Sequence, residues 1–257
     1  MKVAIFDSGV GGLTVLHSAM KQMPYNEYIY YADLDNVPYG NKDKDVVNDL
    51  TFRAVEQIYD LGVDAIVLAC NTATSISANL LRSKYDIPIV GMEPAVKPAV
   101  MNSFGKRVLV LATELTLKES KLRNLINRLD AKDKVDLLPM SELVDFAEEM
   151  IFEGERVKAL LDQKFSDIDL SVYKTVVLGC THFIYFKKTI EQYFHYSIDV
   201  IDGNQGTVNH LESILLGIDK GSNSKKEKKS VLYYVSGRKV KSSTFEGYMK
   251  YLEKLNT

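Results

Sequence analysis

Short apolar runs alternate along this chain with polar or glycine-containing turns and with segments of helical periodicity. The runs are rich in Val, Ile, Leu and Ala, and each ends at a turn of small or polar residues; they lie at 2–6, 28–31, 64–69, 87–91, 107–111 and 174–179. Continuous apolar strands of this length are typical of parallel sheets that are covered by helices on both faces. The pattern therefore predicts an α/β fold.

An internal repeat predicts that this fold is built from two similar halves. Residues 63–72, which include Cys70, resemble residues 173–182, which include Cys180. The two cysteines are 110 positions apart (180 − 70), which is a plausible length for a domain. Ligands of open α/β sheets bind at the carboxyl ends of strands. We therefore expect two α/β domains that face each other, with both thiols at the cleft between them.

Composition excludes several classes of protein. Of the 257 residues, 46% are hydrophobic and 26% are charged, which is ordinary for a soluble globular protein. The net charge of −2 gives no basic excess to indicate a nucleic-acid partner. We see neither a secretory signal nor an apolar stretch near the roughly 18 residues of a membrane span, so we expect a cytoplasmic protein without a membrane partner.

The chain has only two cysteines, and both occupy the same kind of position. Cys70 and Cys180 each follow a predicted strand and precede a helical pattern. Unpaired backbone N–H groups and the positive end of a helix dipole favour a thiolate at such a place. The alternative is that each thiol is a small buried apolar group, as free cysteines often are. Two such turns in repeated contexts favour a functional pair.

A thiol pair can serve several kinds of chemistry. A redox dithiol usually has the C-x-x-C spacing, which is missing here. Cys70, Cys180 and His182 could supply three zinc ligands, but the two thiols lie in different halves and form no chelating pair. A single nucleophile with His182 as its base would leave Cys70 without a role. Two bases on opposite faces of one carbon explain both thiols, because one thiolate removes a proton while the other thiol donates one.

A second candidate site follows the first strand. Asp7 and Ser8 precede the glycine-rich segment 9–12, which lies between a strand and a helix, where backbone N–H groups can hold an anion. The segment has neither the Lys of a phosphate-binding loop nor the full dinucleotide pattern. A carboxylate or ammonium ligand suits Asp7 and Ser8 better. The alternative is a tight turn in which Asp7 caps the helix.

Taken together, these motifs resemble a known family. Residues 6–15, 31–33, 38–40, 69–73, 91–95 and 178–183 resemble the motifs of glutamate racemases in the aspartate/glutamate racemase superfamily, and 232–237 resembles the last strand of that family. The resemblance spans nearly the whole chain. It implies two pseudo-symmetric domains, the first formed by 1–96 with 208–257 and the second by 97–207. It also implies a homodimer that interconverts L- and D-glutamate for peptidoglycan synthesis without a cofactor or metal.

The resemblance assigns roles to individual residues. Cys70 and Cys180 correspond to the two catalytic bases, with Asp7 tuning Cys70 and His182 tuning Cys180. The residues that correspond to substrate-binding positions of the family are Asp7, Ser8, Tyr39, Gly40, Asn71, Thr72, Thr181 and His182.

The second half departs from the family pattern. Glu114 stands where a small residue is usual, and Ile184 where Pro is usual. The acidic residue of the family has no clean match, and Asp145, Glu149 and Glu153 are the candidates. Two other functions therefore stay open: a racemase of another amino acid, with aspartate first, and a racemase-like binding protein without activity.

Overall fold

The computed structural model describes residues 1–92, 95–194, 196–218 and 230–255, so Glu93 and Pro94 of the family-like motif lie outside the described residues. The strands are β1 (Lys2–Asp7), β2 (Glu27–Ala32), β3 (Ala65–Leu68), β4 (Ile89–Gly91), β5 (Arg107–Ala112), β6 (Val135–Pro139), β7 (Tyr173–Leu178), β8 (Asp199–Asp202), β9 (Val231–Val235) and β10 (Arg238–Val240). The α-helices are α1 (Leu13–Gln22), α2 (Lys44–Asp60), α3 (Asn71–Lys84), α4 (Val96–Met101), α5 (Glu114–Lys118), α6 (Ser120–Arg128), α7 (Glu142–Glu148), α8 (Glu155–Phe165), α9 (Lys187–Glu191), α10 (Asn204–Ile218) and α11 (Glu246–Leu255). The 3₁₀ helices are η1 (Tyr39–Asn41), η2 (Leu170–Val172), η3 (Thr181–Phe186) and η4 (Ser242–Thr244).

These elements confirm the predicted α/β fold with two sheets of related topology. One sheet has the order β10-β9-β2-β1-β3-β4 and the other has the order β6-β5-β7-β8. The second order repeats the β2-β1-β3-β4 portion of the first, and every pairing within these portions is parallel. The strand order reverses between β1 and β3, and again between β5 and β7. Ligands of such sheets bind beside this reversal point.

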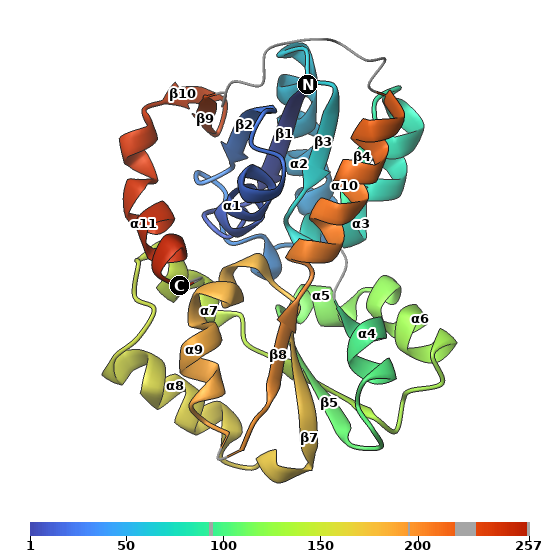
Figure 1. Cartoon of the computed structure of the whole chain (residues 1–257), viewed down its shortest axis with the longest axis vertical. Helices are drawn as coiled ribbons and strands as arrows, with labels where there is room; N and C mark the ends of the chain where they lie inside the picture. The colour runs from blue at the N-terminus through green and yellow to red at the C-terminus, as the bar shows by residue number, and fades with distance from the viewer. Residues whose placement is uncertain (93–94, 195, 219–229, 256–257) are drawn as a thin grey trace.

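Helices cover both faces of the first sheet, which explains why its strands are apolar throughout. Successive side chains of a strand point to opposite faces. Val3 and Ile5 of β1 therefore join one apolar cluster, while Ala4 and Phe6 join another that includes residues of α2 and α3. All four residues are fully buried. Figure 1 shows this sheet in the upper lobe and the second sheet, with β5, β7 and β8, in the lower lobe.

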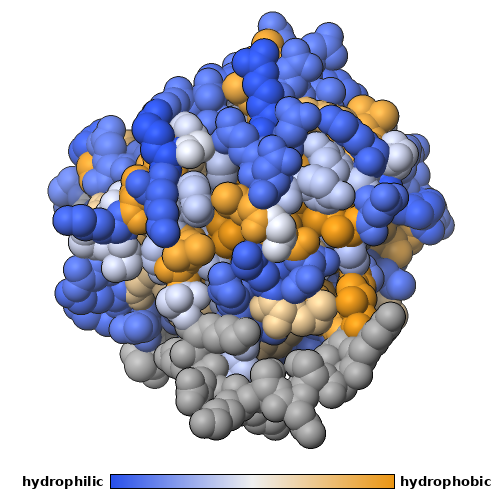
Figure 2. Space-filling view, turned by 90° about the horizontal axis from the view of Figure 1, so that it is seen from above, coloured by the Kyte–Doolittle hydropathy of each residue, from blue (hydrophilic) through white to orange (hydrophobic). Residues whose placement is uncertain are grey.

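The two lobes share part of their apolar core. The cluster that includes β1 continues through Val10 and Leu13 to Phe183 and Tyr185, which follow β7. The lobes are therefore in direct contact through the segments that follow β1 and β7. The chain returns from the lower lobe through β8 into α10, which packs against α1 (Figure 1). Figure 2 shows the outer face of the upper lobe, which is mostly hydrophilic with apolar groups in a band across its middle.

The segment after Cys180 differs from the α-helix that follows Cys70. The sequence pattern predicts a helical stretch there, and the structure has the 3₁₀ helix η3 before the short helix α9. Residues i and i+3 lie on the same side of a 3₁₀ helix. Phe183 and Phe186 have this spacing and are both fully buried. The repeat in sequence therefore does not extend to the helix type that follows the two cysteines.

Candidate active site

The two thiols lie at equivalent strand ends of the two lobes. Cys70 follows β3 and is the N-cap residue of α3, where its Sγ accepts the backbone N–H of Ala73 at 3.5 Å. Ser8 Oγ lies 3.5 Å from the same sulfur. Cys180 follows β7 and precedes η3. Both cysteines are buried and free of disulfides. Across the described ranges, no three His, Cys, Asp or Glu side chains are grouped to hold a metal ion.

Cys180 is the first member of a hydrogen-bonded chain that joins the lobes. Its Sγ lies 3.7 Å from Nδ1 of His182. The other ring nitrogen of His182 lies 2.7 Å from Oε1 of Glu148, at the end of α7. The same carboxylate oxygen accepts the backbone N–H of Val10 at 2.8 Å. Val10 belongs to the loop after β1, so the chain runs from the lower lobe into the upper one.

This arrangement favours the protonated form of His182. Burial by itself would lower the pKa of His182, but its hydrogen bonds with Cys180 and Glu148 and the charges of these partners outweigh that effect. The pKa of His182 is therefore raised well above its ordinary value. A protonated imidazole next to Cys180 can donate a hydrogen bond to the sulfur and stabilise negative charge on it.

The carboxylate that contacts His182 is none of the three sequence candidates. Glu148 makes the contact, whereas Asp145 lines a cavity at the opening between the lobes and Glu149 pairs with exposed Arg156 at 3.1 Å. Helical periodicity contains a signal for this choice. Val144 is buried on α7, and a residue four positions later lies on the same face of a helix. That position is Glu148.

Asp7 also links the lobes, and it does not cap α1. Its Oδ2 accepts a hydrogen bond from Thr181 Oγ1 at 3.0 Å, and its Oδ1 accepts the backbone N–H of Gly9 at 2.8 Å. The N-cap residue of α1 is Gly12, without a side-chain hydrogen bond. Asp7 is fully buried, and burial raises its pKa although the charge of His182 opposes the shift.

The electrostatic environment of Cys70 differs from that of Cys180, which lies next to His182. Burial and then the negative charge of Asp7 raise the pKa of Cys70 to about 12, against an ordinary value of 9.0. The hydrogen bonds from Ala73 and Ser8 oppose this shift only in part. At neutral pH Cys70 is therefore a protonated thiol. One thiol is placed as a proton donor, and the other lies next to a cationic partner.

The glycines after Asp7 allow the lobes to approach each other. A Cβ atom on Gly11 would lie 2.7 Å from the backbone nitrogen of His182 and in steric conflict with the side chain of Thr181. A Cβ atom on Gly9 would clash with Glu148. The glycine-rich segment therefore provides close contact with the other lobe, which the sequence pattern alone did not distinguish from an anion-binding loop.

Two buried tyrosines hold the backbone of this segment, one from each lobe. Tyr30 of β2 donates its hydroxyl to the carbonyl of Gly9 at 2.6 Å, and Tyr185 of η3 donates to the carbonyl of Val10 at 2.9 Å. Both side chains are fully buried. The tyrosines thus position the loop whose N–H groups contact Asp7 and Glu148.

Three threonine hydroxyls form a second polar contact between the lobes. Thr72 of α3 lies 3.2 Å from Thr113 and 3.1 Å from Thr116, measured between Oγ1 atoms, and the latter two are 3.0 Å apart. All three residues are buried. The sequence motifs include Thr72 among the candidate site residues but give no such indication for Thr116. The signal for Thr113 is its place at the end of β5, which corresponds to Asp7 at the end of β1.

The remaining predicted residues have different partners. Asn71 is buried, and its Oδ1 has no hydrogen-bond partner among the described residues. The hydroxyl of Tyr39 donates to Asp33 at 2.7 Å, within the loop that follows β2. Gly40 lies against Thr113, and a Cβ atom there would come within 2.7 Å of the threonine Cβ.

A cavity of about 600 Å³ opens between the lobes beside Gly40. Its lining includes residues of both lobes, from the loop before α2 and from α5 and α7. Glu114, one of the departures from the family pattern, lies on this lining in the first turn of α5 and pairs with Lys118 at 3.3 Å. Its side chain is 60% exposed, so the unusual residue lies at the opening of the cavity, whereas both thiols are buried.

Comparisons with known proteins agree with this architecture. The model of the family described as Asp/Glu/Hydantoin racemase matches residues 14–211. A glutamate racemase of Halothermothrix orenii is 50% identical over 241 residues, which cover 93% of this chain and 94% of that protein. Among solved structures, glutamate racemase of Campylobacter jejuni matches with a TM-score of 0.79 and 28% identity over 99% of both chains. Escherichia coli glutamate racemase, solved with L-glutamate and the activator UDP-MurNAc-ala, matches with a TM-score of 0.78 and 29% identity over 90% of this chain and 88% of that chain.

The family model covers more than half of the chain, and the H. orenii relative matches almost all of it. The chain therefore belongs to the Asp/Glu/Hydantoin racemase family and is an amino-acid racemase, an isomerase.

Proposed function

We propose that this enzyme interconverts L- and D-glutamate by proton transfer through Cys70 and Cys180. The observation that supports this most is the placement of the two free thiols at equivalent ends of β3 and β7, in lobes that contact each other. The names of the relatives support glutamate as the substrate.

The electrostatic difference between the thiols supports a division of roles. The thiolate of Cys180, stabilised by protonated His182, takes the α-proton from one enantiomer, so that a C–H bond breaks and an S–H bond forms. The electron pair stays on the α-carbon as a carbanion-like state. The S–H bond of Cys70 then breaks and its proton joins the opposite face of that carbon. The reverse direction exchanges the two roles. Both proton transfers use the protein's own groups, so the proposal includes no cofactor.

The polar groups around the thiols suit a zwitterionic substrate. The unpaired Oδ1 of Asn71 and the carboxylate of Asp7 are acceptors for an ammonium group. The hydroxyls of Thr72, Thr113 and Thr116 currently bond to one another and can instead donate to a carboxylate. Hydrogen bonds to the carboxylate also stabilise the negative charge that develops when the α-proton leaves.

Exchange of the α-proton tests this function directly. The purified enzyme should incorporate deuterium from D₂O into both glutamate enantiomers, and failure with both would contradict the proposal. Faster exchange of aspartate than of glutamate would favour the aspartate alternative. Glutamate binding without any exchange would favour an inactive binding protein.

Removal of single thiols tests the mechanism separately. Cys70→Ala and Cys180→Ala should each abolish racemisation, because each thiol serves one face of the α-carbon. Near-normal turnover in either variant would contradict the two-thiol mechanism while leaving the racemase activity in place.

The wider assignments carried by the resemblance are also proposals. We propose a cytoplasmic homodimer whose D-glutamate supplies peptidoglycan synthesis, with one domain formed by 1–96 and 208–257 and the other by 97–207. Expression of the chain should restore growth of a bacterial strain that requires added D-glutamate. Light scattering after size exclusion measures the oligomeric state, and a monomer at all concentrations would contradict the homodimer.

A further inference from the structure

An ion pair joins the two lobes beside the cavity that opens next to Gly40. Nζ of Lys44, on α2 of the upper lobe, lies 3.1 Å from Oε2 of Glu119, which stands between α5 and α6 of the lower lobe. Two further ion pairs on this cavity lie entirely within the lower lobe: Lys118–Glu114 and Lys164–Glu142. The first pair therefore depends on how the lobes are placed, whereas the other two do not.

Neither member of this ion pair is favourably placed without the other. Lys44 is the first residue of α2, where the positive end of the helix dipole disfavours a cation. The side chain of Glu119 is only 11% exposed, and it makes no capping hydrogen bond to α6. A carboxylate that is removed from water needs a compensating partner. Each charge thus offsets an unfavourable feature of the other's position.

The ion pair flanks a close contact between the lobes. On the upper lobe, Gly40 belongs to η1, which shortly precedes the lysine. On the lower lobe, Thr113 is the N-cap residue of α5 and the glutamate is its C-cap residue. The two elements pack together, and a Cβ atom on Gly40 would come within 2.7 Å of the Cβ of Thr113. Thr113 also contacts Thr72, which lies near Cys70 at the start of α3. The ion pair therefore supports the contact that separates the cavity from the thiol site.

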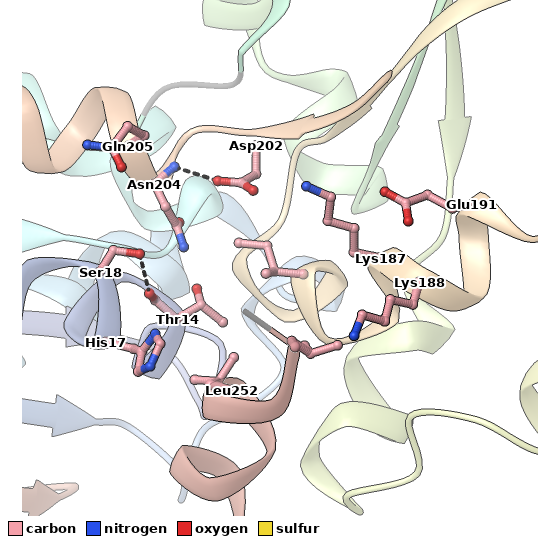
Figure 3. A pocket seen from close by; sticks show the side chains of 12 residues that line it. Thr14, His17, Ser18, Lys187, Lys188, Glu191, Asp202, Asn204, Gln205 and Leu252 are labelled. Carbon is pink, nitrogen blue, oxygen red and sulfur yellow. Dashed lines mark hydrogen bonds between the residues drawn. The ribbon is translucent and has the colours of Figure 1, made fainter. Parts of the chain in front are cut away.

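Figure 3 shows another pocket at the boundary between the lobes, lined by α1 and α11 of the upper lobe and by α9 of the lower lobe. Lys187 and Glu191 extend from α9 there, and within the part of the chain that the structure describes neither forms an ion pair with the upper lobe. Substitutions that remove the Lys44 or Glu119 charge should therefore loosen the boundary near Gly40 and leave this one unchanged.

We propose that Lys44 and Glu119 are positioning residues for the racemisation, because their ion pair holds η1 against α5 and so keeps the site closed around the substrate. This inference rests on the proposed function. Both thiols are buried, so a looser contact between η1 and α5 should make them easier to reach. The pair itself touches neither thiol, and its loss should therefore change access and binding more than proton transfer.

Steady-state kinetics of the full-length enzyme test the positioning role. Lys44→Met and Glu119→Gln should each raise KM for both glutamate enantiomers about threefold to fivefold, as loss of one solvent-accessible ion pair does, and should change kcat less than twofold. The exchanged pair, Lys44→Glu with Glu119→Lys, should restore KM. Lys118→Met is the matched control, because it removes a lysine of the same cavity whose partner lies on the same helix. Equal rises of KM in Lys44→Met and Lys118→Met would show that the charge of the cavity attracts the substrate, and would overturn the proposal.

Alkylation of the thiols tests the closure without any substrate. Cys70 and Cys180 are the only cysteines of the chain, and mass spectrometry follows each of them. Iodoacetamide is neutral and reports access alone, whereas the anion iodoacetate also responds to the charge of the cavity. Glu119→Gln and Lys44→Met should react with iodoacetamide about threefold to fivefold faster than the wild type, and Lys118→Met should react at the wild-type rate.

The two measurements separate this proposal from the proposed function. Wild-type iodoacetamide rates in both Glu119→Gln and Lys44→Met, or changes with iodoacetate alone, would overturn the closure whether or not the enzyme racemises glutamate. A wild type that exchanges no α-proton would contradict the proposed function, and the alkylation rates would still decide the closure. Glu119→Gln keeps the shape of the side chain, so it serves if Lys44→Met, which leaves a buried carboxylate without its partner, fails to fold.

Discussion

Nε2 of His182 lies 2.7 Å from Oε1 of Glu148, and that oxygen also accepts the backbone N–H of Val10 from the other lobe. The charge state of the imidazole next to Cys180 therefore depends on a carboxylate that both lobes hold in place. A separate lower lobe would have the cysteine and the histidine but would lack the Val10 hydrogen bond to Glu148. Contact between the lobes thus completes the hydrogen-bonded chain that runs from Cys180 through His182 to Glu148.

Glu148→Gln should lower kcat about tenfold to a hundredfold, because the imidazolium of His182 loses its anionic partner. The pKa of His182 should fall toward its ordinary value, which NMR titration of the ring protons measures. The two enantiomers have equal free energy in water, so kcat/KM must fall by the same factor in both directions. Glu149→Gln removes a neighbouring carboxylate that pairs with exposed Arg156 and should change neither quantity. An unchanged His182 titration in Glu148→Gln would contradict this account.

Tyr185→Phe should lower kcat about tenfold with little change in KM, because it removes one hydrogen bond that positions the Val10 carbonyl and hence the N–H group bound to Glu148. The ring and its packing stay in place. Tyr193→Phe is the control, since its hydroxyl bonds to Lys158 and Asp162 at the surface of the lower lobe. Steady-state kinetics in both directions make the comparison. A rise in KM with kcat unchanged would indicate that Tyr185 acts on substrate binding instead.

The sequence predicted the two strands that precede the cysteines. The apolar run before Cys70 and the repeated run before Cys180 both became parallel strands, because burial on both faces selects such residues. In parallel sheets, polar residues lie at the ends of the strands. Because both cysteines follow the repeated apolar run, the repeat placed both thiols at strand ends. The common strand order of the two sheets agrees with the repeat as well.

Contacts between distant segments could not be predicted in the same way. Asp7 lies 174 positions from Thr181, its hydrogen-bond partner, whereas the nearby helix suggested a capping role. The acidic residue on α7 was also missed, because several carboxylates occur close together and only the orientation of the helix against His182 selects Glu148. Such choices depend on how the lobes pack, which spacing along the chain does not determine.

Cys70 should make the stability of the enzyme sensitive to alkaline pH. The folded pKa of about 12 lies above the ordinary value of 9.0, so the folded protein keeps a proton that the unfolded chain loses. The stability gained in this way is fully present below pH 9.0 and is lost as the pH rises toward 12. The free energy of unfolding of wild type, relative to Cys70→Ala, should therefore decrease between these values in urea titrations. Ser77→Ala is the control, because it changes a buried residue on the same helix that has no titrating group. The difference in free energy of unfolding between wild type and this variant should stay constant with pH. A constant difference for Cys70→Ala would contradict the raised pKa.

Gly11→Ala should abolish most activity, because the added methyl group would lie against the backbone of His182 and the side chain of Thr181. The lobes would have to separate, and overpacking of this kind costs about 1–3 kcal/mol of stability. Gly206→Ala is the matched control. It lies in α10, and apart from its chain neighbours and the backbone of its own helix no atom lies within 4 Å of the added Cβ, so alanine should raise the stability by up to about 1 kcal/mol and leave activity unchanged. Urea unfolding and α-proton exchange in D₂O measure the two effects. Normal exchange by Gly11→Ala would show that the close approach of the lobes at this loop is unnecessary for proton transfer.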